Sequence, residues 1–364
     1  MIRLLAALSL LWLAACAAAQ TDSSAQKPPQ SVAILPPANL AEAADAAPRM
    51  VARMRQVLQQ KKVELADSAV VAEVLRKHRV RNAAELELAE AQLVAAESPV
   101  RYLLLSSLDR YSETDSSAEV ALSARLLDVP TATVVWANTV ALHRDPRTNF
   151  LGIGSHRAEG LADAAVKDLL KPFRLTQNSK RKQVQALKPR SKGQPETPCR
   201  RVALVTFGNE TETHFAGNIL VNELLAAMLK RGFTMVDPGR VREVMLNSQE
   251  LMQGEISSSL LKKCREDLGA DFVLTGTVSH FEAIRGQTFD EPIVAFEARL
   301  IDTQRSEPVW AKSYSRDGKD SAWMFNLGYV HGLTVLSERM SRRLASDLPV
   351  RRARVNLSVQ EQTR

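Results

Sequence analysis

The sequence is poor in cysteine, in aromatic residues and in long apolar segments. Three cysteines in 364 residues cannot build a disulfide framework, which excludes the disulfide-dense mini-proteins. Aromatic residues make up only 5% of the chain. No run of 18 consecutive apolar residues occurs after the N-terminal segment, so no later span is predicted to cross a membrane as a helix. With 45% hydrophobic and 24% charged residues, the chain is still expected to bury an ordinary globular core in two or three domains.

The motifs of common enzyme chemistry are also missing. The chain contains no HExxH, GxSxG, CxxC, P-loop or GxGxxG pattern. Its six histidines are scattered, and its carboxylates alternate with bases at helical spacing, which is typical of solvated helix faces. We therefore predict no catalytic, cofactor-binding or metal-binding residue, and hence no enzyme. The basic stretches lack interleaved aromatic residues, which argues against nucleic-acid binding.

The N-terminus has the pattern of a secretory signal, with Arg3 before the apolar run Leu4–Ala15. The next residue is Cys16, and Leu13-Ala14-Ala15-Cys16 resembles the bacterial lipobox. This resemblance implies cleavage before Cys16 and acylation of that cysteine, and several acyl chains give a permanent anchor. Ala17 is not the aspartate that retains lipoproteins in the inner membrane, which favours the periplasmic face of the outer membrane. The alternative is a generic signal peptide with an incidental cysteine.

The chain repeats itself. Residues 124–137 (ARLLDVPTATVVWA) and 298–311 (ARLIDTQRSEPVWA) share seven identities in fourteen positions, at an offset of 174. Upstream, VAILP at 32–36 corresponds to VALVT at 202–206, and YLLLSSL at 102–108 corresponds to FVLTGTV at 272–278, both at an offset of 170. Because this spacing is the length of a domain, it indicates a tandem duplication and not a solenoid.

Each copy is predicted to contain a short strand, an amphipathic helix, two more helices, a buried strand, a β-hairpin and a closing helix. The first copy has strands at Val32–Leu35, 102–108, Glu119–Asp128 and Val134–His143, and helices at about Ala44–Lys61, Ser68–Lys77, Glu85–Ala96 and His156–Leu170. The second has strands at Val202–Phe207, 233–237, 272–278, Ile293–Asp302 and Pro308–Arg316, and helices at about Ala216–Arg231, Val241–Asn247, Ser258–Asp267 and Val330–Ala345. The fold class is α/β (α+β), with two mixed sheets covered by helices.

A basic linker separates the copies. Residues 174–200 have no helical or strand period and carry eight Lys/Arg against one Glu, a net charge of +7. The predicted organisation is a signal peptide (1–15), a lipidated tether (16–30), a first domain (31–173), the linker (174–200), a second domain (201–348) and a basic tail (349–364). The linker is either a solvated spacer or a contact for an anionic surface.

The motifs of the second copy resemble a family of envelope domains. VALVTF, the polar loop FGNETETHFAG, LGADFVLTGTV and ARLIDTQRSEPVWAKSY are similar to segments of the family that includes the secretion lipoprotein CsgG, the synthase activator LpoB and the N-terminal domain of TolB. The first copy is a more degenerate match. The resemblance implies tandem mixed-sheet domains and a binding role without catalytic residues.

Several residues have a predicted structural role, and for some of them an alternative role is open. Trp136 and Trp310 are predicted to be core residues, with a ligand-stacking surface as the alternative. Gly269 is expected to end a helix, Gly276 to allow close approach on a central strand, and Asp128 and Asp302 to accept backbone N–H groups at hairpin turns. In an oxidising periplasm Cys199 and Cys264 could form a disulfide, although a helical cysteine serves equally well as a small core residue.

The function predicted from these observations is that of an outer-membrane-anchored periplasmic lipoprotein, a binding or assembly module for a cell-envelope machine. Its partners are the membrane, through the lipid anchor, and an envelope protein; homo-oligomerisation stays open. The candidate partner interface consists of Trp323, Phe325 and Tyr329 in SAWMFNLGYVHG, because an exposed apolar cluster is typical of a surface that a partner protein buries. The alternative is a CsgG-like oligomeric secretion channel, which the short, polar segment Ser279–Pro292 disfavours because it leaves little room for membrane-crossing strands.

Overall fold

The computed structural model describes residues 31–114, 117–145, 157–175, 201–248, 256–285, 290–321 and 328–349. The mixed α/β class predicted from the sequence is confirmed. Two mixed sheets are present, one in the first copy of the duplicated unit (the first repeat) and one in the second copy (the second repeat). Among the described residues, no helix has both the length and the apolar composition that a membrane crossing requires.

In the described residues, the first repeat has four helices and a five-stranded sheet. Its elements are β1 Val32–Ile34, β2 Ala38–Asn39, α2 Ala46–Gln60, α3 Ser68–Lys77, α4 Leu88–Glu97, β3 Tyr102–Glu113, β4 Ala118–Asp128, β5 Thr133–Arg144 and α5 Ala158–Leu170. The strand order is β1-β3-β4-β5, with β2 beside β3. β1 runs parallel to β3, and the other long pairs are antiparallel.

The second repeat follows the same order. Its elements are β6 Arg201–Leu204, β7 Gly208–Asn209, α7 Ala216–Lys230, β8 Thr234–Met235, α8 Pro238–Asn247, α9 Ser258–Leu268, β9 Phe272–Arg285, β10 Asp290–Asp302, β11 Glu307–Asp317 and α10 Leu333–Asp347. The strand order is β11-β10-β9-β6-β8, with β7 beside β9. The counterpart of β8 in the first repeat is a single bridge between Val32 and Leu65. The two copies therefore share one topology.

Local signals place the helix ends and the closest strand contacts. Ser257 accepts a hydrogen bond from the backbone N–H of Leu260, at 3.1 Å, and so caps α9. Gly269 ends α9 in the left-handed conformation, at φ 60°, as the sequence predicts. Gly276 confirms the expected close approach, because a Cβ there would lie 1.9 Å from the carbonyl oxygen of Glu297.

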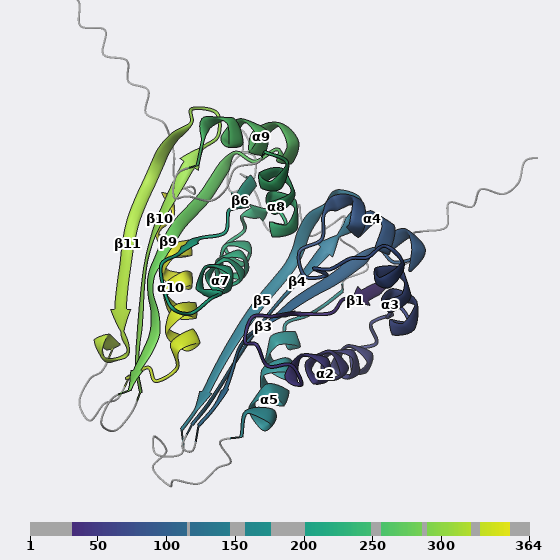
Figure 1. The fold of residues 1–364 in the computed structure, drawn as a ribbon, viewed down its shortest axis with the longest axis horizontal. Helices are drawn as coiled ribbons and strands as arrows, with labels where there is room; N and C mark the ends of the chain where they lie inside the picture. The colour runs from purple at the N-terminus through teal and green to yellow at the C-terminus, as the bar shows by residue number, and fades with distance from the viewer. Residues whose placement is uncertain are drawn as a thin grey trace, which may run out of the picture.

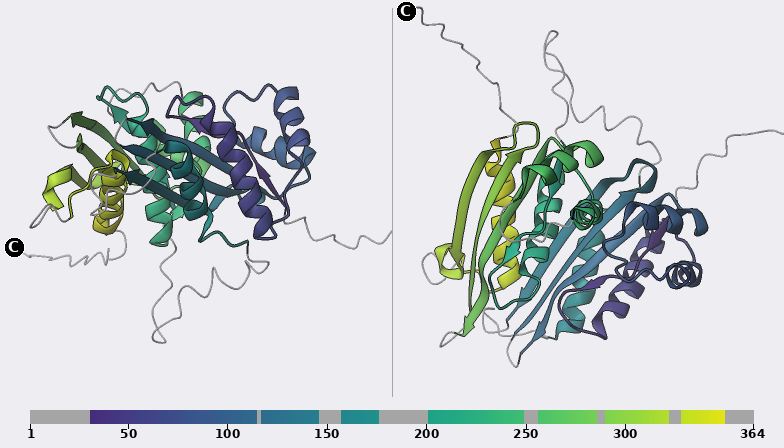
Figure 2. Two further views of the ribbon diagram at one scale, coloured as in Figure 1. Left: turned by 90° about the horizontal axis from the view of Figure 1, so that it is seen from below. Right: turned by 45° about the horizontal axis from the view of Figure 1, so that its top comes forward.

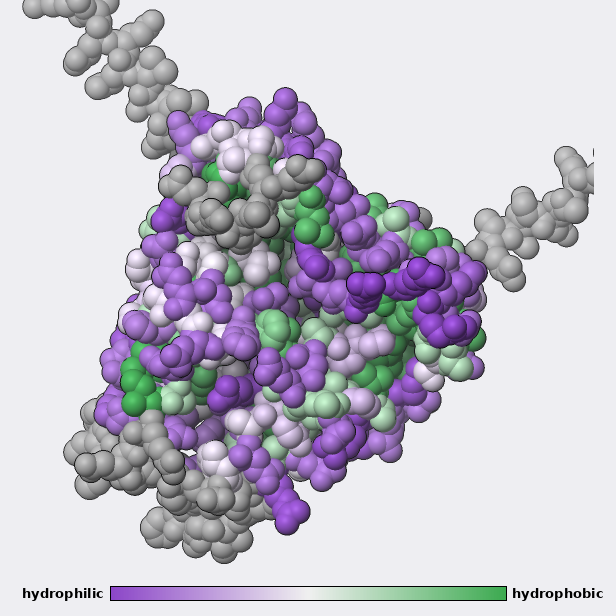
Figure 3. Space-filling view, in the orientation of Figure 1, coloured by the Kyte–Doolittle hydropathy of each residue, from purple (hydrophilic) through white to green (hydrophobic). Residues whose placement is uncertain are grey.

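The elements stack in four layers (Figure 1). The sheet of the second repeat is followed by the helix pair α7 and α10, then by the sheet of the first repeat, and then by the helix pair α2 and α5. Both views of Figure 2 keep this order. Helices α3 and α4, and likewise α8 and α9, cover only one end of the other face of their own sheet. The visible surface is mostly hydrophilic, with small scattered apolar patches (Figure 3).

Two expectations from the sequence are wrong. The strand predicted at 272–278 is too short, because β9 continues through the polar residues after Val278 to Arg285, and β10 begins at Asp290. Backbone pairing with β10 holds these polar residues in the strand. Asp128 accepts hydrogen bonds from the guanidinium of Arg101, at 2.7 and 3.2 Å, and from the hydroxyl of Thr131, instead of from turn N–H groups. Asp302 does accept the predicted backbone N–H groups, those of Gln304 and Arg305.

Candidate functional site at the seam between the repeats

The two repeats meet along a surface that we call the seam, where α7 and α10 pack on β4 and β5. Val134 and Ala137 of β5 belong to the main hydrophobic core of the second repeat. Every residue of β4, from Ala118 to Asp128, is buried, because α5 packs on one face of the strand and α7 on the other. The seam is thus as buried as a domain interior.

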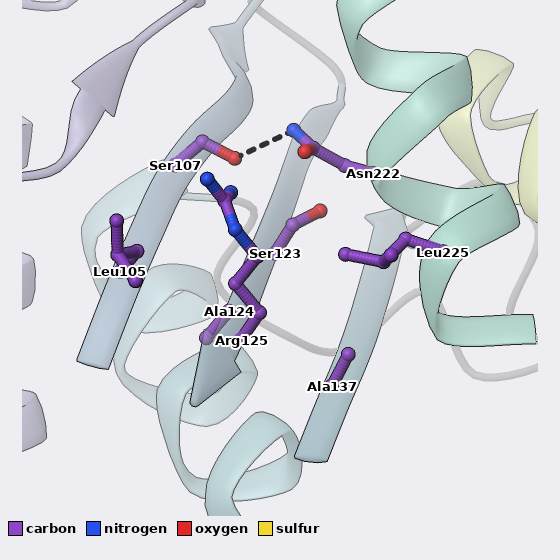
Figure 4. A pocket seen from close by; sticks show the side chains of 8 residues that line it. All are labelled: Leu105, Ser107, Ser123, Ala124, Arg125, Ala137, Asn222 and Leu225. Atoms are coloured by element: carbon purple, nitrogen blue, oxygen red, sulfur yellow. Dashed lines mark hydrogen bonds between the residues drawn. The ribbon is translucent and has the colours of Figure 1, made fainter. Parts of the chain in front are cut away.

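A carboxylate lies inside the seam. The hydroxyls of Ser107 and Ser123 and the side-chain amide of Asn222 on α7 all donate to Asp109, at 2.6 Å from Ser107 and 3.3 Å from Asn222. Burial raises the pKa of Asp109 to about 6, against the opposite effect of these hydrogen bonds. Asn222 also donates to the hydroxyl of Ser107, at 3.0 Å (Figure 4). The amide of the second repeat therefore completes a polar cluster of the first.

The cavity beside this cluster is too small for a ligand. Its volume is about 10 Å³, near the lower limit for one water molecule. Residues of both repeats line it, among them Leu105, Arg125 and Leu225 (Figure 4). The geometry indicates a packed junction and not a binding pocket.

Further polar groups join the helix layer to the seam. Glu223 on α7 accepts hydrogen bonds from the hydroxyls of Ser337 and Ser341 on α10, at 2.6 and 2.9 Å, and burial raises its pKa well above the ordinary value. Thr139 of β5 donates to Glu338 of α10 at 3.2 Å. At the C-terminus of α7, Lys230 donates to the side-chain oxygen of Asn138 at 2.6 Å. Satisfied polar groups of this kind specify one docking geometry.

An ion pair is buried at the other end of the seam. The Nε of Arg125 on β4 lies 2.7 Å from Asp237, the N-cap residue of α8, and another guanidinium nitrogen donates to the carbonyl of Ala84 at 2.6 Å. The second oxygen of Asp237 accepts the backbone N–H of Gly239 at 2.9 Å. A Cβ on Gly239 would lie 2.3 Å from the carbonyl oxygen of Leu86. Glycine is thus required for the close approach of α8 to the first repeat.

Two contacts complete the seam near the start of α10. Glu119 of β4 accepts hydrogen bonds from both the backbone N–H and the hydroxyl of Thr334, at 2.8 Å each. The rings of His143 and His331 stack with their centroids 6.1 Å apart. Each repeat contributes one partner to each contact.

A wider groove opens between the repeats beside α8. It has a volume of about 240 Å³ and is lined mainly by charged residues, including Arg79, Arg81 and Glu90. Several of its carboxylates already have partners: Arg242 lies 3.4 Å from Glu85, and Glu243 accepts the backbone N–H of Leu88. The groove is a solvated edge of the seam.

The seam was missed by sequence reasoning, although signals for it exist. Glu119, Ser123 and Arg125 occupy alternate positions of a strand whose other face is apolar, and Asn222-Glu223 interrupts an otherwise apolar helix. Alternation alone indicates a solvated face. Only the neighbouring repeat shows that this face is buried.

The predicted site residues have different positions. Cys16, Cys199, Trp323 and Phe325 lie outside the described residues. Cys264 is buried in the apolar cluster beneath α8 and α9, so its pairing with Cys199 stays a prediction for mass spectrometry of the unreduced protein. Tyr329 is half-buried, with its ring 4.2 Å from that of His331, and burial raises its pKa. Its role as a partner contact also stays a prediction.

The two tryptophans are half-buried rather than fully enclosed. Trp136 packs on the core of the first repeat and meets the edge of Phe173 with ring centroids 5.0 Å apart. Trp310 packs on the core of the second repeat from the edge strand β11. Both therefore contact the core, as the sequence predicts for core residues. Within the described ranges, no group of three or more His, Cys, Asp or Glu side chains could hold a metal ion.

In the comparisons with known proteins, the two halves of the chain match different family models. Residues 21–182 match the family model "Putative lipoprotein GNA1162-like", and residues 175–315 match "Peptidoglycan-synthase activator LpoB". No curated protein matches the chain.

Three similar solved structures each match less than half of the chain. Lipoprotein GNA1162 from Neisseria meningitidis is 18% identical, over 40% of this chain and 100% of its own, with a TM-score of 0.30. A PelC dodecamer from Paraburkholderia phytofirmans is 22% identical, over 40% and 84%, with a TM-score of 0.29. The LpoB C-terminal domain from Escherichia coli is 16% identical, over 32% and 82%, with a TM-score of 0.25. The two family matches confirm the resemblance read from the sequence: the chain carries tandem envelope-lipoprotein domains, the first similar to the GNA1162-like family and the second to the LpoB family.

Proposed function

We propose that the protein is a lipoprotein anchored in the outer membrane by Cys16, and that it acts in the periplasm as a non-catalytic binding module for a cell-envelope machine. The observation that carries this proposal is the match of residues 175–315 to the family model of a peptidoglycan-synthase activator. The match of residues 21–182 to a lipoprotein family supports the anchor.

The seam supports a role as a rigid adaptor. Buried hydrogen bonds and the Arg125–Asp237 ion pair fix the two repeats in one geometry. Surfaces on both repeats are therefore presented together to a partner. Because the second repeat resembles the activator family, the periplasmic part of a peptidoglycan synthase is the first partner to test.

We propose that Trp323, Phe325 and Tyr329 form the partner contact. Tyr329 supports this role because it lies four residues before the start of α10 and its half-buried ring leaves part of its surface for another protein. Aromatic side chains are the residues that most often dominate binding energy at interfaces.

The test is crosslinking of the full chain in intact cells, followed by purification and identification of the partner. A variant with all three aromatic residues changed to Ala should lose the crosslinked partner. A matched variant with Lys180, Arg181, Lys182, Lys188, Arg190 and Lys192 changed to Gln should keep most of it, since binding by the folded domains is expected to depend on a packed, largely desolvated patch and not on solvated charges. The opposite pattern would overturn the assignment of the contact. Circular dichroism of both variants checks that each is folded.

The anchor has its own test. Cys16→Ser should leave the protein unlipidated, so that it no longer fractionates with the outer membrane, because the acyl chains supply the binding energy. A matched Ser23→Ala change in the tether should leave fractionation unchanged. Outer-membrane fractionation of the Cys16→Ser protein would contradict the proposed anchor.

A further inference from the structure

The seam is directional: the helix layer of one repeat lies on the sheet of the other, so the two contact surfaces differ. Within the chain, the helix layer of the second repeat contacts the sheet of the first repeat. The corresponding helix layer of the first repeat and the sheet of the second repeat lie at the two ends of the stack. The outer face of β9, β10 and β11 is uncovered at one end, and the outer face of α2 and α5 is uncovered at the other (Figures 1 and 2). We propose that a second copy of this chain docks its α2/α5 layer on the uncovered face of β9–β11.

The buried ion pair of the seam has an exposed counterpart on each end surface. At the offset of 174, Arg125 corresponds to Arg299 on β10; at the offset of 170, Asp237 corresponds to Asp67. Asp67 caps α3 as Asp237 caps α8, by accepting the backbone N–H two residues ahead. The Arg299 side chain is 46% exposed and pairs with Glu297 of its own strand, and Asp67 is exposed. Docking in the geometry of the seam brings Arg299 to Asp67 of the second copy.

Part of the uncovered face also repeats the seam. Ala121 and Ala137 correspond to Ala295 and Ala311, so the small residues that let a helix approach the sheet are retained. Thr139 corresponds to Ser313, which is exposed. Its seam partner Glu338 corresponds to Asp163 on the exposed side of α5, counting from the first residue of each helix. A hydroxyl-to-carboxylate contact is thus available at the same place between copies.

Several differences make the contact between copies looser than the seam. The contacts Asp109–Asn222 and Glu119–Thr334 are not repeated, because the corresponding pairs are Ser279 with Ala52 and Ile293 with Glu159. Leu225, which lines the seam cavity, corresponds to Arg55 on α2. Gly239, whose Cβ would meet the Leu86 carbonyl at 2.3 Å, corresponds to Ala69. The second copy must therefore sit slightly farther away at this point. The association is accordingly reversible, dependent on concentration and sensitive to salt.

The contact is heterologous, because a sheet face meets a helix face. Each bound copy again exposes one surface of each kind, so addition continues into a closed ring or an open filament. A symmetric dimer that pairs two sheet faces would use Arg299 but not Asp67. Substitution of Asp67 therefore distinguishes the sheet-to-helix contact from a symmetric dimer.

The test is sedimentation velocity of the full chain in a nonionic detergent, over a concentration series. The unmodified chain should sediment faster as concentration rises. Arg299→Asp and Asp67→Arg should each weaken association about tenfold, and the double variant should restore it, because the charges are exchanged across one contact. Arg339→Asp, on α10 between the two sheets, is the matched control and should have no effect. Ala69→Gly should tighten association, since it removes the obstructing Cβ.

A second readout reports the geometry directly. A chain carrying both Ser313→Cys and Asp163→Cys should form disulfide-linked ladders on non-reducing gels, whereas each single variant should add no bands beyond those of the unmodified chain. A chain that stays monomeric throughout the concentration series overturns the proposal. So does weakening by Arg299→Asp alone, without effect of Asp67→Arg, which assigns the sheet face to a symmetric dimer.

Discussion

Two strands with nearly the same sequence differ in burial, one lying at the seam of the repeats and the other at an outer face. ARLLD in β4 and ARLID in β10 begin with the same three residues, yet Arg125 is 8% exposed by its side chain and Arg299 is 46% exposed. The difference arises because α7 and α8 of the second repeat cover the first sheet, whereas no described element covers the same part of the second. One local sequence is therefore compatible with a buried and with a solvated face, and its energetic importance depends on its neighbours.

The largest contrast is expected at these two arginines. Arg125→Ala leaves the carboxylate of Asp237 buried without its cation, and should reduce the free energy of unfolding by about 3–5 kcal/mol. Arg299→Ala removes an exposed pair and should cost less than about 1 kcal/mol. Urea denaturation followed by circular dichroism measures both. Equal losses would show that the seam does not enclose Arg125 as the structure indicates.

The pH dependence of stability should also separate the repeats. Asp109 has a folded-state pKa of about 6 against an ordinary 3.8, whereas its counterpart in the second repeat is Ser279, which does not titrate. Between these pH values the unfolded chain loses the proton and the folded chain keeps it, so stability falls as pH rises. This loss reaches about 3 kcal/mol by pH 7.

Asp109→Asn should therefore flatten the decline in stability between pH 4 and pH 7. Glu223 contributes a decline of the same sign, which stays in the variant. Ser279→Ala, at the counterpart position in the second repeat, is the control: it removes no titratable group and should leave the slope unchanged. Urea midpoints at several pH values give the measurement, and an unaltered slope in the Asp109 variant would show that this carboxyl is not desolvated.

The smallest contrast is expected at the tryptophans. Trp136→Ala removes a half-buried ring and its contact with Phe173, and should cost about 2 kcal/mol, below the range for fully enclosed aromatic residues. Trp310→Ala, on the edge strand, should cost about 1 kcal/mol, as is typical of a substitution that removes few enclosed contacts. Thermal unfolding of both variants tests the order, and a greater loss for Trp310 would reverse it.

Most secondary structure could be predicted because its causes are local. The helix at Ser68–Lys77 has the predicted bounds, since Asp67 caps it and an apolar stripe repeats along it. The hairpins lie where β-branched alternation places them. The strand extension from Ser279 to Arg285 was not predicted, because its polar residues are held by pairing with β10, a contact between strands that composition does not report.

The sequence by itself determined the duplication, the order of helices and strands in each copy, the helix caps and the lipobox resemblance, because each depends on residues close together in the chain. Only the tertiary structure decided which faces are buried. Asp109, Arg125 and Glu119 are polar residues on a strand pattern that fits a solvated surface equally well. Their burial depends on Asn222, Asp237 and Thr334, more than one hundred residues away, and on hydrogen bonds that form only when the second repeat docks.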